Sequence, residues 1–448
     1  MKEPLTRNDH RDFLLLAIPL IISTISTPLL GVVDTAVMGR LPDPAYIGGV
    51  SVGTLIFNTL FWLFGFLRVS TSGYSAQANG SQSQSAIYFA FLRPAFIALC
   101  FGLLFVILQW PIKAGAFMLL SPDQQVKSLA ETYYDIRIYG APFTLLNYVI
   151  LGWLIGMAKV KVSLFLQVYM NVLNIILDVV FVMVLNFNVG GVAAASLISE
   201  VSAFLIGIMI ILRMNNLNIS TILWKKVFDP KPFIEMMKVN RDLFIRTLCL
   251  LTVFNLFTYY GIRYGNTTLA ANAVLLQAHF IMAYFLDGFA NASSILVGKS
   301  IGAKDKALYQ KTIRLTKIWG FITAISLSLF TIFIQKPVVQ IFTTIPEVQE
   351  VALQYMNWVA LFPLVAFWGL QLYGVFSGAT TAAPIRNSMI YSLVCYLIVL
   401  WIVTPQWGNH GLWLSFIVFS LGRSLFLWMY LPGLTKKLFG EKGVIEAC

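Results

Sequence analysis

The chain has 448 residues, of which 58% are hydrophobic and only 11% are charged, and its formal net charge at pH 7 is +12. A water-soluble protein of this length needs many more charged residues to cover its surface, so the composition excludes that class. Apolar runs of about twenty residues recur along the chain, and each can cross a hydrocarbon core about 30 Å thick. We therefore expect an all-α integral membrane protein, because backbone in lipid must satisfy its own hydrogen bonds.

Twelve apolar runs are predicted to be transmembrane helices. In chain order they lie near residues 12–39, 46–71, 88–108, 131–157, 162–186, 190–212, 240–262, 269–296, 315–335, 348–376, 387–404 and 410–431. The first run is not expected to be a cleaved signal peptide, because it is too long, contains Pro19 and Pro28 and is followed by eleven more runs.

The lysines and arginines gather in alternate connections between these runs, including the polar segment 213–241, whereas the remaining connections carry few. The positive-inside rule then predicts that both termini are cytoplasmic and that the protein is a multi-pass protein of a bacterial inner membrane. Because the charge is explained as an orientation signal, the expected partner is the lipid bilayer and not nucleic acid. The four cysteines are scattered without metal-type spacing, so no metal site and no cofactor are expected.

The two halves of the chain contain similar segments about 220 residues apart. The pairs are Ala76–Gly80 with Gly298–Gly302, Ala141–Phe143 with Phe362–Leu364, and Gly190–Gly191 with His410–Gly411. We expect an N-terminal six-helix lobe at 1–213, a cytoplasmic linker at 214–239, and a C-terminal six-helix lobe with a short cytoplasmic tail at 240–448. An even number of helices per lobe predicts pseudo-two-fold symmetry about the membrane normal, with a substrate cleft between the lobes.

A few polar residues lie inside the predicted spans of the N-terminal lobe. An acid in hydrocarbon costs about 3 kcal/mol unless it faces a protein interior or a cavity. Asp34 lies in the first span and Asp178 in the fifth, where Asn174 shares its helix face at a spacing of four residues. Together with Asn147 in the fourth span and Ser196 in the sixth, these residues are predicted to converge on one buried site. Alternatively, Asn147, Asn174 and Ser196 are interhelical hydrogen-bond partners, each contributing about 1 kcal/mol.

Two prolines interrupt the span that carries Asp34. Pro19 and Pro28 remove backbone hydrogen bonds, so the helix can kink, and protonation of Asp34 could then be coupled to its bending. The alternative is a static kink, which membrane helices tolerate.

The C-terminal half contains two further polar residues within spans. Asp287 is either a second coupling group or, as the favoured alternative, a structural partner for a cation such as Arg246. His279 has no second metal ligand nearby and is expected to be a packing residue.

The sequence resembles the multidrug and toxic compound extrusion (MATE) family, specifically its DinF subfamily. The matching segments run through both halves and are Pro19, Pro28–Gly39 (with Asp34 and Met38), Tyr46–Gly53, Leu67–Thr71, Leu151–Gly156, Asn174–Asp178, Leu286–Ala290 and Arg386–Met389.

The resemblance implies a twelve-helix, two-lobed secondary antiporter that exports cationic amphipathic drugs or toxic compounds in exchange for protons by alternating access. It assigns proton coupling to residues that match Asp34, Asn174, Asp178 and Ser196. Pro19 matches the proline associated with bending of the first helix, and Asp34 and Met38 are assigned to the substrate cavity. The protein is expected to act as a monomer.

The coupling ion is predicted from the lack of acidic residues at two positions where sodium-coupled relatives carry them. Sodium-coupled NorM-type relatives carry acids on helices 7 and 10, but here helix 7 offers Asn255 and Leu256, and helix 10 has no acid from Val351 to Phe376. Protons are therefore favoured over sodium.

Three other functions compete with antiport. A passive channel would normally repeat an acidic or carbonyl ring, which the two unequal halves of the sequence do not provide. A flippase or exporter of a lipid-linked or other amphipathic metabolite should need several arginines or lysines in its cavity, and the N-terminal spans offer few. An enzyme is not expected, because three isolated histidines supply neither a nucleophile with its base nor a metal cluster.

Overall fold

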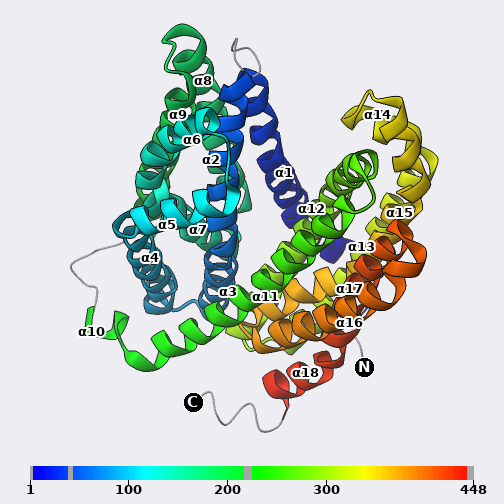
Figure 1. The fold of residues 1–448 in the computed structure, drawn as a ribbon. Helices are drawn as coiled ribbons and strands as arrows, with labels where there is room; N and C mark the ends of the chain where they lie inside the picture. Colours follow the sequence, from blue (N-terminus) through cyan, green and yellow to red (C-terminus); the bar gives the residue numbers. More distant parts are fainter. Residues whose placement is uncertain (1–3, 39–43, 216–223, 441–448) are drawn as a thin grey trace. The chain divides into compact units, whose positions relative to one another are not determined.

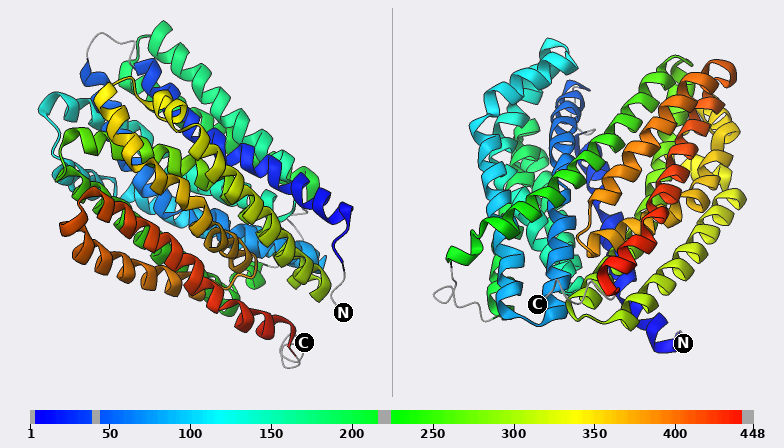
Figure 2. Two further views of the ribbon diagram at one scale, coloured as in Figure 1. Left: turned by 90° about the vertical axis from the view of Figure 1, so that its right-hand side faces the viewer. Right: turned by 90° about the horizontal axis from the view of Figure 1, so that it is seen from below.

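A computed structural model describes residues 4–38, 44–215 and 224–440, with their side chains except those of residues 26–38, 44, 215, 224 and 225. Within these ranges every regular element is a helix, and no strand occurs (Figures 1 and 2). Eleven helices of the described part are long and apolar enough to cross a membrane, and they coincide with the second to twelfth predicted spans. The all-α membrane fold is confirmed. The first predicted span falls on α1 (Arg7–Met38), so the count of twelve stays a prediction.

The chain packs as two compact units, and the first comprises residues 25–236. Its described helices after α1 are α2 (Pro44–Leu63), α3 (Phe66–Ser81), α4 (Gln84–Ile107), α5 (Gln109–Leu120), α6 (Gln124–Arg137), α7 (Ala141–Gly156), α8 (Val160–Asp178), α9 (Asn188–Asn215) and α10 (Trp224–Val227). A 3₁₀ turn, η1 (Ile138–Gly140), joins α6 to α7, and a π-helix, η2 (Val179–Val184), continues α8. Helix α7 packs against α3, α4 and α9, and α8 packs against α9 (Figure 1).

The second unit comprises residues 1–24 and 237–448, so that α1 and α11 each cross a unit boundary. Its helices are α11 (Pro230–Ile262), α12 (Asn266–Gly302), α13 (Lys306–Phe333), α14 (Gln335–Phe342), α15 (Pro346–Gly378), α16 (Ala383–Trp407), α17 (Asn409–Met429) and α18 (Leu431–Phe439). Helix α15 packs against α12, α13 and α17, and α16 packs against α17. The start of α1 lies on α12, where the Thr24 hydroxyl donates to the Tyr284 carbonyl at 3.2 Å.

The same helix contact occurs in both units at a constant offset. A Cβ added to Gly152, Gly156, Gly374 or Gly378 would overlap the carbonyl oxygen of Arg68, Ser72, Ala290 or Ser294, respectively. Each member of the second set follows its counterpart by 222 residues (152 to 374, 156 to 378, 68 to 290, 72 to 294). Only glycine allows α7 to approach α3, and α15 to approach α12, this closely. The constant offset supports the duplication predicted at a spacing of about 220 residues.

The predicted lobes, 1–213 and 240–448, are sets of consecutive helices, whereas the two compact units are defined by which residues pack together. The lobe boundaries therefore stay a prediction. Residues 216–223 of the predicted linker lie outside the described residues. The outer surfaces carry large apolar side chains, among them Trp110, Phe333 and Trp401, which are 70%, 80% and 70% exposed. Surfaces of this kind suit contact with lipid chains.

Candidate functional site

The predicted residues Asn174, Asp178 and Ser196 lie together where α8 packs against α9. Asp178 is the last residue of α8, and its exposed fraction is 0%, while that of Asn174 is 1%. The Asn174 amide satisfies both of its ends when its nitrogen donates to Asp178 Oδ2 at 3.3 Å and its oxygen accepts from Ser196 N at 3.0 Å and Ser196 Oγ at 3.3 Å. Asn174 therefore connects the carboxylate to the neighbouring helix.

The backbone changes its hydrogen-bond pattern immediately after Asp178. The π-helix Val179–Val184 begins at the next residue, and the Leu185 N–H donates to the Val180 carbonyl at 3.0 Å, five residues back. Single π-helical turns inside membrane helices are uncommon and often occur at functional sites. Asp178 thus lies at the junction of two helix types.

Asn147 of α7 is hydrogen-bonded to α9 one helical turn beyond Ser196. Its exposed fraction is 4%, and its Nδ2 donates to the backbone carbonyl of Glu200 at 2.9 Å. Glu200 follows Ser196 by four residues, so both occupy one face of α9. The Asn147 Oδ1 atom is buried and finds no hydrogen-bond partner among the described residues.

An ion pair that the sequence analysis missed completes this polar cluster. Arg137 at the end of α6 donates from both terminal nitrogens to Glu200, at 2.7 Å to Oε2 and 2.5 Å to Oε1. The Thr144 hydroxyl donates to the same Oε2 at 2.6 Å. The Arg137 guanidinium also lies 5.6 Å from the centre of the Phe57 ring and 5.3 Å from that of Phe61. The two charged side chains are only 8% and 12% exposed.

A signal for this pair existed in the sequence. Arg137 falls inside the predicted span 131–157, and Glu200 falls inside the predicted span 190–212. Opposite charges in two apolar runs of the same predicted lobe indicate a buried pair, because each would be costly to bury alone.

The remaining predicted site residues lie on α1. Pro19 lies within its described part, and the helix is regular on both sides of it. Asp34 and Met38 belong to the same helix, but their side chains lie outside the described part of the chain. Their assignment to proton coupling and to the substrate cavity therefore stays a prediction.

His279 of α12 is a packing residue, as predicted. It is 5% exposed, and its ring contacts the phenylalanine rings 254, 280, 362 and 416, the nearest at a centroid distance of 4.0 Å. Its Nδ1 finds no hydrogen-bond partner within the described ranges.

The choice between a coupling role and a structural role for Asp287, with a cation such as Arg246 as its partner, stays a prediction. No ion pair within 4.0 Å joins these two described side chains, and the Arg246 guanidinium instead lies 4.5 Å from the centre of the Tyr373 ring.

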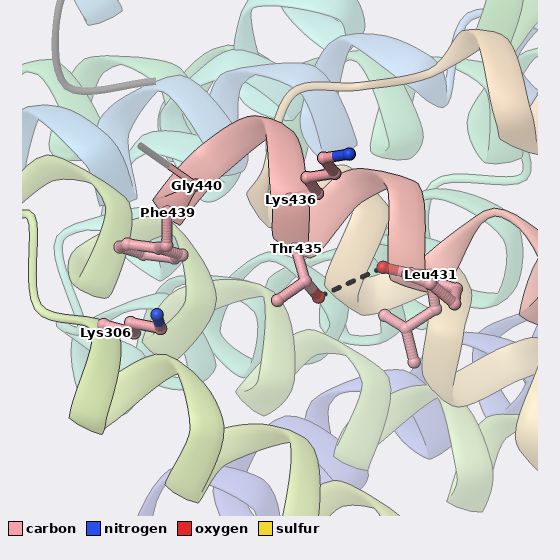
Figure 3. A pocket seen from close by; sticks show the side chains of 7 residues that line it. Lys306, Leu431, Thr435, Lys436, Phe439 and Gly440 are labelled. Atoms are coloured by element: carbon pink, nitrogen blue, oxygen red, sulfur yellow. Dashed lines mark hydrogen bonds between the residues drawn. The ribbon is translucent and has the colours of Figure 1, made fainter. Parts of the chain in front are cut away.

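An open groove of about 480 Å³ lies between α18 and the start of α13, lined by Lys306, Leu431, Pro432, Thr435, Lys436, Phe439 and Gly440 (Figure 3). Inside α18, the Thr435 hydroxyl donates to the Leu431 carbonyl at 3.1 Å. The groove contains none of the predicted site residues, so we assign no transport chemistry to it.

Apolar helices that enclose a small cluster of hydrogen-bonded polar and charged groups define a polytopic membrane protein of the transporter or channel type. The MatE family model matches residues 19–180 and 243–403, which together make up more than half of the chain. The chain belongs to the MatE family of membrane transporters.

Two curated relatives agree with this assignment. The chain is 37% identical to DNA damage-inducible protein F of Escherichia coli (strain K12), over 92% of this chain and 90% of that protein. It is 21% identical to the probable multidrug resistance protein NorM of Bacillus cereus, over 91% and 92% of the two chains.

Solved structures share the fold. Structures of a MATE protein in a bent and a straight conformation align with TM-scores of 0.86 and 0.85, at 19% and 20% identity. They cover 95% and 96% of this chain and 96% and 97% of theirs.

Proposed function

We propose that this protein is a secondary antiporter that exports cationic amphipathic compounds in exchange for protons by alternating access. The observation that best supports this is the fully buried Asp178, which Asn174 connects to Ser196. A carboxylate enclosed by apolar helices can be neutralised either by a proton or by a cation, so the two compete. Competition of this kind is what a proton–cation antiporter requires. Asn147 extends the same site through its bond to α9.

Asp34 is the second coupling group of the proposal, and Asp34 and Met38 line the substrate cavity. The boundary between the two packing units falls between Thr24 and Ile25, inside α1 and between Pro19 and Pro28. A continuous helix that is shared by two units and contains a proline on each side of the boundary is suited to bend there. Protonation of Asp34 would favour the bent form, and Pro19 would permit it.

The exchange has a defined driving force. One proton for one monovalent cation moves no net charge, so the pH gradient alone drives export, at about 1.4 kcal/mol per pH unit. A second proton would add the membrane potential, about 2.3 kcal/mol per 100 mV.

The proposal places the protein as a monomer in a bacterial inner membrane with both termini in the cytoplasm, as the distribution of lysine and arginine indicates. Sodium coupling is not proposed, because helix α15 carries no acid from Val351 to Phe376 and α11 offers Asn255 and Leu256. In the rival function, export of a lipid-linked metabolite, an anionic headgroup needs a cation to bind. Arg137, which lies near the proposed proton-coupling site, is already paired with Glu200, so an anionic headgroup would have to bind elsewhere in the protein.

The test is dye transport in everted membrane vesicles that contain the protein, with ethidium or rhodamine 6G as substrate. We expect accumulation that collapses with nigericin, which dissipates the pH gradient, and that persists when potassium replaces sodium. Vesicles without the protein serve as the control. A strict sodium requirement would contradict proton coupling, and dye uptake equal to that of the control vesicles would contradict drug export.

A further inference from the structure

Arginines on two different membrane-spanning candidates lie close to the same aromatic side chain in the unit that contains residues 237–448. Arg246 belongs to α11 and Arg423 to α17. Arg246 lies over the Tyr373 ring of α15 at 4.5 Å, and Arg423 lies 5.7 Å from the centre of the Phe419 ring. Arg423 interacts electrostatically with Arg246, with Tyr373 and with Asp287 of α12. Charged and aromatic groups from four helices therefore gather in one place.

Neither arginine of this cluster forms an ion pair with a side chain that the structure describes. Among the described residues neither arginine has a carboxylate within 4.0 Å, and Arg246 Nε is buried without a hydrogen-bond partner. Asp287 is the carboxylate that interacts electrostatically with Arg423.

The other unit shows how this protein satisfies a buried arginine when its role is structural. Arg137 makes two charge-assisted bonds to Glu200, and Thr144 supports the same carboxylate. Arg246 instead places its guanidinium over the face of the Tyr373 ring. The Arg246 and Arg423 side chains are partly exposed, but Arg246 Nε is fully buried, and leaving a buried guanidinium nitrogen without a hydrogen-bond partner is costly. The arrangement is explained best if a negative group from outside the chain binds there during the transport cycle.

We propose that Arg246 and Arg423 form a binding site for the carboxylate or phosphate group of an amphipathic substrate. The guanidinium fork matches both anions with paired hydrogen bonds, and Tyr373 and Phe419 supply apolar contact for the adjoining part of the molecule. The inference rests on the proposed export function and narrows it: molecules that carry a negative group on an apolar, cation-bearing body are the preferred substrates.

The test compares two dyes that differ only in this group. Tetramethylrhodamine has a free carboxylate, and its methyl ester has none, while the cationic fluorophore is the same. Binding to the purified full-length protein is measured by fluorescence anisotropy. We expect the preference for the free acid, expressed as the ratio of the two dissociation constants, to fall about tenfold in Arg246→Gln and in Arg423→Gln. Arg246→Lys should retain part of it, because the charge remains but the fork is lost.

The matched control is Arg263→Gln. Arg263 also lies over tyrosine rings, at 5.4 Å from Tyr259 and 4.8 Å from Tyr260, but it follows the end of α11 and is exposed. Its substitution should leave the ratio unchanged. An equal ratio in wild type, Arg246→Gln and Arg423→Gln, with each variant shown to be folded by its elution profile, would overturn the proposal.

A competition arm distinguishes the two sources of such a group. Displacement of the acid dye by dihexanoyl phosphatidate, but not by dihexanoyl phosphatidylcholine, would assign the site to a lipid headgroup. If the protein still prefers the acid dye and phosphatidate does not displace that dye, the site would be assigned to a soluble organic anion. Both outcomes support an anion site. Because the assay needs no proton gradient, a failure of proton-driven export in vesicles would leave the dye ratio intact, so the two proposals can fail separately.

Discussion

Arg137 and Glu200, 63 residues apart, form a bidentate ion pair that ties the junction of α6 and α7 to α9. Glu200 also offers its backbone carbonyl to Asn147, and Ser196 lies one turn away on the same helix. The ion pair therefore holds in place the face of α9 that carries Ser196 and that accepts the hydrogen bond from Asn147. Arg137 and Glu200 neutralise each other. Of the two carboxylates in this polar cluster, we therefore base proton coupling on Asp178 and not on Glu200.

Glu200→Gln should lower the free energy of unfolding by about 3–5 kcal/mol, because the Arg137 cation would stay buried without its counter-charge. The double variant Arg137→Gln/Glu200→Gln should lose less free energy of unfolding than Glu200→Gln alone, because no unpaired charge stays buried. Stability is measured by titrating the purified protein in mild detergent with sodium dodecyl sulfate. If the effects of the two single substitutions simply add in the double variant, the pair does not contribute as a unit.

Asp34→Asn should abolish proton-driven dye efflux while folding and membrane insertion stay intact, since the amide has nearly the same volume but cannot release a proton. Asp178→Asn should impair efflux as well, although two interacting carboxyl groups share their titration, so the losses need not be equal. The measurement is efflux per folded transporter in everted vesicles. Wild-type efflux from Asp34→Asn would remove that residue from the mechanism, and loss in Asp34→Asn alone would reduce Asp178 to a structural role.

Gly374→Ala should destabilise the protein by about 1–3 kcal/mol, because the new Cβ would overlap the Ala290 carbonyl and force α15 away from α12. Gly433 of α18 is the matched control, since a Cβ there has no neighbour within 4 Å. Gly433→Ala should be neutral or stabilising by up to about 1 kcal/mol, as expected for an exposed helix position. Thermal unfolding in detergent compares the two variants. Equal midpoints would mean that the close helix contact contributes little.

The first turn of α1 should respond to pH through Asp9. Thr6 donates to Asp9 Oδ2 from its backbone N–H and from its hydroxyl, both at 2.8 Å. These bonds hold the pKa of Asp9 below its ordinary value of 3.8, so the carboxylate stabilises the turn above that pH and loses this effect as the pH falls through its lowered pKa.

Asp9→Ala should therefore speed amide exchange in the first turn of α1 at pH 7, by the loss of a capping contact of about 1 kcal/mol, and the difference from wild type should shrink as the pH falls below 3.8. Hydrogen-exchange mass spectrometry of the N-terminal peptide measures this. Asp12→Ala is the control, because Asp12 is 67% exposed and pairs with Arg11 only at 3.6 Å. A pH-independent difference between wild type and Asp9→Ala would contradict the role of the charge.

The sequence by itself determined the membrane spans, because hydrophobic length is a local property of the chain. The second to twelfth predicted spans all coincide with observed helices. Their ends were harder to predict. Helix α13 begins at Lys306, nine residues before the predicted span 315–335, because the helix continues beyond the apolar run to the cap where Asp305 accepts from the Leu308 N–H at 2.9 Å. The short helices α5, α14 and α18 were not predicted, since they are too short to span a bilayer.

Local spacing also placed Asn174 and Asp178 on one face of a helix, and the packing of α8 on α9 brought Ser196 to them. Which other side chains meet was decided by tertiary structure alone. Arg137 meets Glu200, Gly374 meets Ala290, and Arg246 meets Tyr373. The physical reason is that composition fixes which helices enter the membrane, whereas their rotation and closeness of approach depend on packing between segments far apart in the chain.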